Sequence, residues 1–407
     1  MKIIITHPKK YACLRRQAAM MFVAVAFIVG TFPSLAAAQD LEISGWVPYW
    51  TSGAPKAAQK HLGDLSMIHP FGYALQSDGN IKDLMGIKKG AWKNLLSAAR
   101  KDDVLVVPTI TTSNGSLVHT ILSDKTLRTN HIKKILSVVK KEKFDGIDID
   151  YEGKLSATKD SYSLFLKELK KGLGDKILSC TIEARTPPED LYRTVPDDLA
   201  YANDYDAIAK YCDRVNIMAY DQQRADITLN DANKGAPYIP VSDVAWVRAV
   251  LNLTLETIPA DKIVLGVATY GHEYEVLVTP DRYAEYRRAG AFNIPSIEKK
   301  MKKHNIEPSR SGAGELAFSY SDLIKHAPQF ITNFSIPKDT PESLVVAARS
   351  LAYASATGNA AVFNYVTWSD AGAMKDKIDL AEEYNLLGIA LFKIDGQEDA
   401  DVWDELE

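Results

Sequence analysis

Eight short apolar segments recur along the chain, most of them followed by stretches with the periodicity of an amphipathic helix. Strand-like segments that alternate with helices form parallel strands joined by crossover helices. Eight such units close into a (β/α)8 barrel, the TIM barrel. We therefore predict an α/β fold of this kind, with strands at residues 43–50, 65–75, 104–112, 144–152, 177–185, 214–221, 262–271 and 388–395.

The interval between the seventh and eighth predicted strands is far longer than one crossover helix requires. It contains a helix end followed by a strand pattern, "AYASATGNAAVFNYVTW", and a break rich in serine and glycine, "SRSGAGE". We predict a small α/β insertion at residues 273–370, so that residues 41–272 and 371–407 form the barrel.

The first 38 residues have the organisation of a secretory signal peptide. Lysines and arginines precede an apolar run at residues 18–32, and an A-x-A pattern stands just before Gln39. We expect cleavage there and a location that is secreted, periplasmic or in the cell envelope, with no stable membrane insertion afterwards. An uncleaved membrane anchor is the alternative, although the apolar run is short for a span.

Composition narrows the classes of partner. The formal net charge is -4, from 48 basic and 52 acidic residues, so no basic excess favours nucleic acid. We expect a monomer that binds no nucleic acid. The mature chain keeps Cys180 and Cys212, which can pair in an oxidising compartment or remain buried thiols.

The fourth predicted strand, "FDGIDIDYEGK", carries four acids among apolar residues. Side chains two apart share one face of a strand, so Asp148, Asp150 and Glu152 point the same way. Like charges this close cannot all ionise, and one carboxyl group then keeps a proton that it can donate near neutral pH. The stack therefore indicates acid–base chemistry.

Metal binding is the competing interpretation of these acids, because Asp-x-Asp pairs hold divalent ions. His69 and His272, near the ends of the second and seventh strands, could join such a site. No other histidine spacing supports it, so we predict neither a metal nor a cofactor.

Residues 145–152, "DGIDIDYE", resemble the DGxDxDxE signature of glycoside hydrolase family 18, the chitinase-like family. Residues 218–221, "MAYD", resemble its second motif, MxYD, and "GVATYG" resembles its seventh strand. The chain from 43 to 395 is most similar to the bacterial branch with spore-germination and cortex-lytic-type hydrolases. This resemblance implies a glycosidase that cleaves β-1,4-linked glycans containing N-acetylglucosamine, either chitin or peptidoglycan.

Roles at the site follow from the resemblance, since this family uses the substrate's own N-acetyl group in place of a nucleophilic carboxylate. It implies that Glu152 is the general acid, that Asp150 orients the acetamido group, and that Asp148 holds Asp150 and shares its proton. It also implies that Tyr220 hydrogen-bonds the acetamido carbonyl and that Asp221 lines the site.

Neighbouring positions complete the motifs. Met218 shares the parity of Tyr220, which predicts that it forms the pocket floor. Asp145 has the opposite parity to the acidic trio, so we assign it and Gly146 structural roles. Phe392 stands where the family usually has a tryptophan on the last strand, and it offers less stacking area to a sugar.

Four further residues are candidates for substrate binding. Trp46, Phe71 and Tyr270 are either aromatic walls of the site or barrel packing. Arg185, two residues after Glu183 at the end of the fifth strand, either pairs internally or reaches a carboxylate of peptidoglycan.

The alternative to an enzyme is a carbohydrate-binding protein on the same fold, with weak or no activity. Relatives of that kind typically lose the acid equivalent to Glu152, and this chain keeps it.

Overall fold

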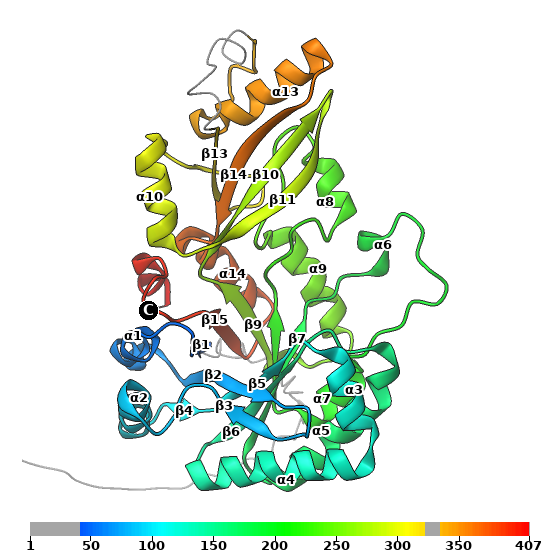
Figure 1. Cartoon of the computed structure of the whole chain (residues 1–407), viewed down its shortest axis with the longest axis vertical. Coiled ribbons are helices and arrows are strands. Elements are labelled where there is room, and N and C mark those ends of the chain that lie inside the picture. Colours follow the sequence, from blue (N-terminus) through cyan, green and yellow to red (C-terminus); the bar gives the residue numbers. More distant parts are fainter. Residues whose placement is uncertain (1–40, 322–333, 407) are drawn as a thin grey trace, which may run out of the picture. The chain divides into compact units, whose positions relative to one another are not determined.

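The computed structural model describes residues 41–321 and 334–406, and the predicted signal peptide at residues 1–38 lies outside them. A ring of parallel strands forms the core, and β1 pairs with both β2 and β15, which closes it (Figure 1). The predicted TIM barrel is thereby confirmed. Around the ring its strands are β1 (Glu42–Pro48), β2 (Met67–Leu75), β5 (Thr109–Thr112), β6 (Gly146–Tyr151), β7 (Ile177–Glu183), β8 (Arg214–Met218), β9 (Ile263–Ala268) and β15 (Gly388–Phe392).

The third predicted strand is split in two, which the apolar pattern did not indicate. Residues Leu105–Val106 form β4, which pairs with β2, and β5 begins only at Thr109. Pro108 lies between them and has no N–H to donate to a ladder. A further short strand, β3 (Ile81–Asp83), extends β2 as an antiparallel hairpin.

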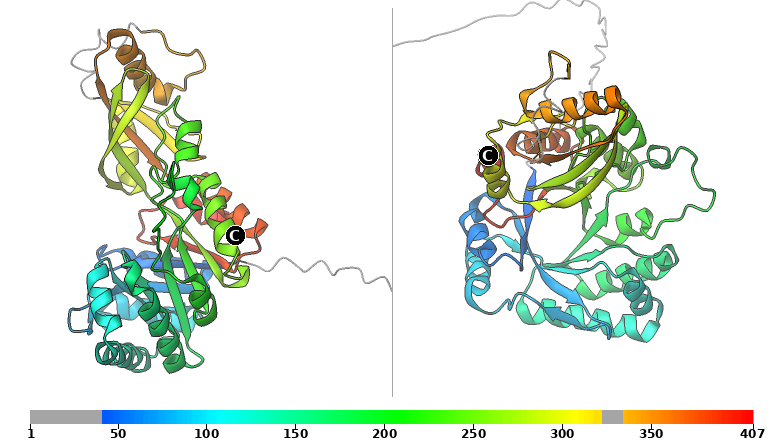
Figure 2. Two further views of the ribbon diagram at one scale, coloured as in Figure 1. Left: turned by 90° about the vertical axis from the view of Figure 1, so that its right-hand side faces the viewer. Right: turned by 45° about the horizontal axis from the view of Figure 1, so that its top comes forward.

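Helices surround the barrel strands in both views of Figure 2. Their apolar faces pack on the outward-facing residues of the strands, which bury the main core. These helices are α1 (Ala54–Lys60), α2 (Gly90–Lys101), α3 (Gly115–Ser123), α4 (Lys125–Glu142), α5 (Lys159–Leu173), α7 (Tyr205–Tyr211), α9 (Val244–Leu255) and α14 (Ala371–Glu383). Two short helices, α6 (Pro188–Leu191) and α8 (Ile227–Ala232), have no buried residues.

Strand β6 is buried along its whole length because both of its faces are covered. Ile147 and Ile149 belong to the core between the strands and the helices, so Asp148 and Asp150 project to the inside of the barrel. Gly146 is required by close approach to β7, since a Cβ there would lie 2.2 Å from the carbonyl oxygen of Ile177.

A second sheet is formed by the chain between β9 and β15. It is antiparallel, with the order β11-β10-β14-β13-β12, and it packs with its own helices. The predicted limits, 273 and 370, lie near its outer residues, Gly271 and Trp368, and the division of the chain there stays a prediction. The elements are β10 (Gly271–Thr279), β11 (Arg282–Phe292), α10 (Ile294–His304), β12 (Ser309–Arg310), β13 (Leu316–Tyr320), α13 (Val345–Thr357) and β14 (Ala361–Trp368).

The two cysteines left open by the sequence form a disulfide. Cys180 on β7 is bonded to Cys212, just before β8, with 6.0 Å between their Cα atoms, and both are buried. Within the described ranges, none of the helices combines the length and the apolar character that a membrane crossing needs.

A buried histidine ties β6 to its neighbours behind the acidic face. The Tyr151 hydroxyl lies 2.6 Å from Nε2 of His131, and Nδ1 of His131 lies 2.7 Å from the carbonyl oxygen of Gly79. The carbonyl can only accept, so Nδ1 carries the proton and Nε2 accepts from the tyrosine. Burial lowers the pKa of His131 to about 4, against the opposing effect of the Gly79 carbonyl.

We predict that His131 makes the free energy of unfolding depend on pH between about 6.5 and about 4. The unfolded chain binds a proton at this position in that window and the folded chain does not. The contribution is therefore complete above the unfolded pKa, and it is lost as the pH falls toward 4, by about 3 kcal/mol. Chemical denaturation across this range should show a smaller decline for His131→Gln than for the wild type.

The matched control is His61→Gln, at a partly exposed histidine. It should leave the decline unchanged. Equal pH dependence in the wild type and in His131→Gln would contradict the prediction.

Candidate active site

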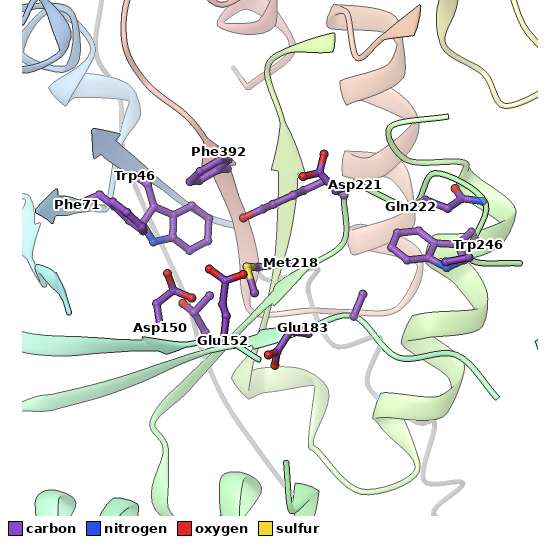
Figure 3. A pocket seen from close by; sticks show the side chains of 14 residues that line it. Trp46, Phe71, Asp150, Glu152, Glu183, Met218, Asp221, Gln222, Trp246 and Phe392 are labelled. Carbon is purple, nitrogen blue, oxygen red and sulfur yellow. The ribbon is translucent and has the colours of Figure 1, made fainter. Parts of the chain in front are cut away.

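A cavity of about 360 Å³ opens at the carboxyl ends of the barrel strands. Figure 3 shows Trp46, Phe71 and Phe392 toward one side of it and Trp246 toward the other, with Glu152 between them. Most of the predicted site residues meet in this one cavity. The predicted residues that line it are Trp46, Phe71, Asp150, Glu152, Met218, Tyr220, Asp221 and Phe392.

Asp148 lies below the cavity and is fully buried. Its carboxylate accepts hydrogen bonds from Nε1 of Trp46 at 3.3 Å, from the hydroxyl groups of Thr109 and Thr181 at 2.8 Å each, and from Nδ2 of Asn216 at 3.4 Å. The indole and amide N–H groups can only donate, so these partners suit an ionised carboxylate. Proton sharing between Asp148 and its neighbour on β6 stays a prediction.

Asp150, which lies two residues further along β6 and lines the cavity, is not surrounded by donors as Asp148 is. Its Oδ1 is buried and has no hydrogen-bond partner within the described ranges. Burial, followed by the negative charges of Glu152 and Asp148, raises the pKa of Asp150 well above its usual value. This group therefore keeps a proton more readily than an ordinary aspartate, and its Oδ1 retains an unused capacity to accept a hydrogen bond.

Glu152 follows the last residue of β6 and is partly exposed to the cavity. Burial and the nearby charge of Glu183 raise its pKa, and Lys154 opposes them. Glu183 also holds the turn after Glu152, because it accepts the N–H of Gly153 at 2.9 Å. The arrangement gives a carboxylic acid at the edge of the cavity, as proton donation requires.

Buried Lys154 and half-buried Glu183 form an ion pair beside this acid. The Lys154 ammonium group lies 3.3 Å from Glu183 and also donates to the carbonyl of Tyr151. Although burial opposes ionisation of Glu183, Lys154 and hydrogen bonds from Asn203 and Gly153 lower its pKa. Glu183 thus keeps a negative charge on the cavity wall.

Aromatic rings form the wall opposite the acids. Tyr220 and Phe392 stack with centroids 5.2 Å apart and an interplanar angle of 13°. Trp46 and Phe71 meet the edge of Phe392 at 5.8 and 6.1 Å. Burial raises the pKa of Tyr220 well above its usual value, so its hydroxyl group keeps its proton and can donate.

Asp221 connects the cavity to the second sheet. Its Oδ1 accepts from the Tyr270 hydroxyl at 2.9 Å and from Nε2 of His272 at 2.6 Å, and Arg288 donates to Nδ1 of His272 at 3.2 Å. Burial opposes the charge of Asp221, but these two hydrogen bonds and the positive charges beyond them lower its pKa. Tyr270, for which the sequence left a wall of the site and barrel packing both open, bonds to Asp221 and is not among the residues that line the cavity.

Arg185 is not brought to the site. Strand β7 ends at Glu183, so the alternation that placed Arg185 on the same face does not continue. The guanidinium carbon lies 4.2 and 3.9 Å from the ring centroids of Tyr201 and Tyr205, while Glu183 pairs with Lys154. The predicted pair of Arg185 with Glu183 is therefore wrong, and Arg185 stacks on two tyrosines outside the cavity lining. Its contact with a substrate carboxylate stays a prediction.

The remaining candidates lie away from the cavity. Asp145 accepts the N–H of Val106 at 2.9 Å, next to the start of β6. His69 is buried in the barrel, with Nδ1 2.9 Å from the carbonyl of Val107. Among residues 41–321 and 334–406, no three His, Cys, Asp or Glu side chains are grouped so as to hold a metal ion.

Sequence reasoning missed several lining residues. Trp246 and Gln222 line the cavity, the former from α9 and the latter just after the second motif. Glu183 was considered only as a partner of Arg185. The available signal was strand parity, because Glu183 lies on the same face of β7 as Ser179 and Thr181, and β7 pairs directly with the acidic strand. Nothing in the apolar pattern of α9 distinguished Trp246 from a core residue.

Comparisons with known proteins point in one direction. The family model described as "Glycosyl hydrolases family 18" matches residues 46–397. A glycosylase of Bacillus subtilis named YvbX, described as uncharacterized, is 24% identical over 296 residues, which are 68% of this chain and 80% of that protein. The cortical fragment-lytic enzyme of Bacillus anthracis is 26% identical over 52% of this chain, and the match spans only 46% of its own length.

Solved structures share the fold. The spore cortex-lytic enzyme SleL of Bacillus cereus superposes with a TM-score of 0.65 at 20% identity, covering 91% of this chain and 74% of that one. A chitinase from Chromobacterium violaceum superposes with a TM-score of 0.66 at 16% identity, covering 90% and 98%. Identities this low establish the barrel and nothing finer.

We predict that Glu183→Gln lowers the pKa of Glu152. The substitution removes a negative charge that favours the protonated form of Glu152, while Lys154, which favours the ionised form, remains. Titration of the Glu152 carboxyl carbon by NMR, with ¹³C-labelled glutamate, should show the shift. Glu298→Gln, an exposed position on α10, is the control and should cause none; an unchanged or raised pKa in Glu183→Gln would contradict the prediction.

Proposed function

The chain belongs to glycoside hydrolase family 18, and from this premise we propose that it cleaves β-1,4-linked glycans containing N-acetylglucosamine by substrate-assisted, retaining catalysis. The observation that carries the proposal is the contrast along β6. Asp148 has its hydrogen bonds satisfied, Asp150 presents an unpartnered oxygen, and Glu152 stands at the cavity edge with a raised pKa.

Each group has a role in the proposed reaction. Glu152 gives its proton to the glycosidic oxygen as the bond to the leaving sugar breaks. The acetamido oxygen of the retained sugar attacks its anomeric carbon and forms a cyclic, oxazolinium-like intermediate. Water then opens this intermediate, and Glu152 takes back a proton. Retention of the anomeric configuration results from the two inversions.

Asp150 and Tyr220 would hold the acetamido group during this reaction. The unpartnered Oδ1 of Asp150 is an acceptor for the acetamido N–H. The positive charge of the intermediate opposes the raised pKa of Asp150 and favours its ionised form, which in turn stabilises the intermediate. The Tyr220 hydroxyl, which keeps its proton, is a donor for the acetamido oxygen. The stacked pair of Tyr220 and Phe392 supplies an apolar surface on which the sugar ring can lie.

The charge of the cavity favours a neutral sugar at the reacting position. Four acids line it, namely Asp150, Glu152, Glu183 and Asp221, and the lining residues include no lysine or arginine. An anionic substituent there would lie beside the charged carboxylates of Glu183 and Asp221, with no lysine or arginine in the lining to bind it. N-acetylglucosamine carries no charge, so it fits this surface in either chitin or peptidoglycan.

We predict that Glu152→Gln lowers kcat on chitin oligomers by at least roughly 10²-fold, because the amide cannot deliver a proton. Asp150→Asn should also lose activity, since the intermediate loses its charged partner. Product release is followed by chromatography, and the anomer formed first is identified by NMR. Glu298→Gln is the matched control and should retain wild-type turnover.

An active Glu152→Gln variant on an unactivated oligomer would contradict the assignment of the acid. Release of the inverted anomer first would contradict substrate-assisted retention. A wild-type chain that cleaves neither chitin oligomers nor peptidoglycan would contradict the proposed activity itself.

We also propose that the protein is exported to the cell envelope or secreted. The residue pattern before Gln39 supports this proposal, and the Cys180–Cys212 disulfide is typical of proteins in oxidising compartments. Export should yield a mature chain that starts near Gln39 or Asp40, as N-terminal sequencing of the extracellular or envelope fraction can determine. Recovery of the full-length chain in the membrane fraction would show that the segment is an anchor.

A further inference from the structure

A second cavity, of about 280 Å³, lies between strand β11 and the connection from β8 to α9. We call it the basic cavity, because three basic side chains line it: Arg224, Lys234 and Arg282. Its one acidic lining residue, Asp231, is paired with Arg193 at 3.0 Å. None of the three basic residues forms an ion pair with the part of the chain that the structure describes. The basic cavity therefore presents a net positive charge to a ligand.

The basic cavity adjoins the catalytic one along a single loop. Gln222 and Ala225 line the catalytic cavity, and Arg224 between them lines the basic cavity. The side chain of Gln222 also donates to the hydroxyl of Tyr238 at 3.3 Å, and Tyr238 lines the basic cavity. The two cavities are thus lined in part by the same loop, residues 222–225.

Hydrogen bonds fix the wall of the basic cavity. The Tyr238 hydroxyl donates to Asp243 at 2.7 Å, and the Tyr238 N–H donates to the hydroxyl of Tyr286 at 3.1 Å. The Arg224 guanidinium carbon lies 5.1 Å from the centroid of the Tyr286 ring. A register shift in the pairing of β10 with β11 lies beside Ala284, and both Tyr283 and Ala284 line the cavity.

One polar atom of this wall lacks a partner. Oδ1 of Asn230 is buried and accepts no hydrogen bond within the described ranges, while its Nδ2 donates to the Arg224 carbonyl at 3.0 Å. The wall thus combines cations, tyrosine hydroxyl groups and an unused acceptor. Such a surface suits a polar anion that also carries hydrogen-bond donors, and it does not suit an apolar ligand.

The charges of the two cavities are opposite in sign. The catalytic cavity is lined by four carboxyl groups without a base, and the basic cavity by three bases with one paired acid. A glycan that carries both neutral and acidic parts would therefore be oriented, with its acidic part excluded from the first cavity and attracted to the second.

We propose that the basic cavity binds a carboxylate carried by a glycan whose neutral N-acetylglucosamine unit occupies the catalytic cavity. This inference rests on the proposed function and adds a substrate class, namely glycans with carboxylate substituents such as those of peptidoglycan. Arg224 and Arg282 bind the carboxylate, because a guanidinium group offers two parallel N–H donors to it, and Lys234 adds a point charge.

Binding to the full-length Glu152→Gln chain tests this inference without any requirement for turnover. The ligands are a peptidoglycan tetrasaccharide with free lactyl carboxylates, the same molecule with those groups converted to amides, and the chitin tetrasaccharide. We expect the acid to bind about tenfold more tightly than its amide at low ionic strength, with the preference declining as salt is added. A fourth ligand retains the stem peptides, whose amide bonds occupy the lactyl carboxyl groups. A gain for the free lactyl acid alone points to the lactyl group, a gain for the peptide form alone to a peptide carboxylate, and a gain for both shows that the basic cavity accepts either.

Substitution identifies the cavity responsible. Arg224→Gln with Arg282→Gln should bring the ratio of the two affinities close to one. Arg287→Gln is the matched control, because Arg287 lies on the same strand, pairs with Glu275 at 2.7 Å and does not line the basic cavity. It should keep the preference for the acid. If the double variant does not fold, as judged by circular dichroism, each single variant should lower the ratio.

Two outcomes would overturn the inference. One is equal binding of the acid and its amide to the parent chain, and the other is a preference that survives both arginine substitutions. Chitin tetrasaccharide that binds normally in either case leaves the proposed function standing. Failure of the parent to bind any of these glycans would contradict the proposed function as well.

Discussion

Burial of carboxyl groups along one face of β6 is the constraint on which the site depends. A carboxylate inside a protein is stable only where donors compensate for lost water, and four barrel strands supply them to Asp148. The donors are Trp46 from β1, Thr109 from β5, Thr181 from β7 and Asn216 from β8. The polar interior of the barrel is thus organised around one charge.

Asp150, the next carboxyl group on this face of β6, lacks the hydrogen-bond donors that compensate Asp148. A donor placed on the free oxygen of Asp150 would stabilise the charged form, and the group would lose its raised pKa. The pKa of Glu152 is raised by partial burial and by the charge of Glu183, and it is lowered by the charge of Lys154, which pairs with Glu183. The two carboxyl groups of β6 and the one just after its end therefore have three distinct environments, which their common spacing alone does not reveal.

Periodic features were the part of this molecule that could be predicted from sequence. Each barrel strand is a short apolar run, and the parity of Asp148 and Asp150 follows from the period of a strand. Arg185 was placed wrongly because parity holds only while a strand continues, and β7 ends at Glu183. Trp246 lies on α9, far in sequence from the acidic strand. A tryptophan on the apolar face of a helix fits the same residue pattern whether it packs in the core or lines a cavity, so the sequence does not distinguish the two. Pairing of Cys180 with Cys212 depends on three-dimensional proximity, which spacing does not supply.

The second sheet is joined to the barrel by hydrogen bonds of two of its buried side chains, Glu315 and His272. Glu315, fully buried, accepts the N–H groups of Val241 and Ser242 in the barrel and the hydroxyl of Thr367 in the sheet, and His272 donates to Asp221. Without the sheet, the N–H groups of Val241 and Ser242 would lose their acceptor, and Asp221 would keep the Tyr270 hydroxyl but lose His272. A change in the sheet therefore reaches the loop that bears Asp221, and with it the wall of the cavity.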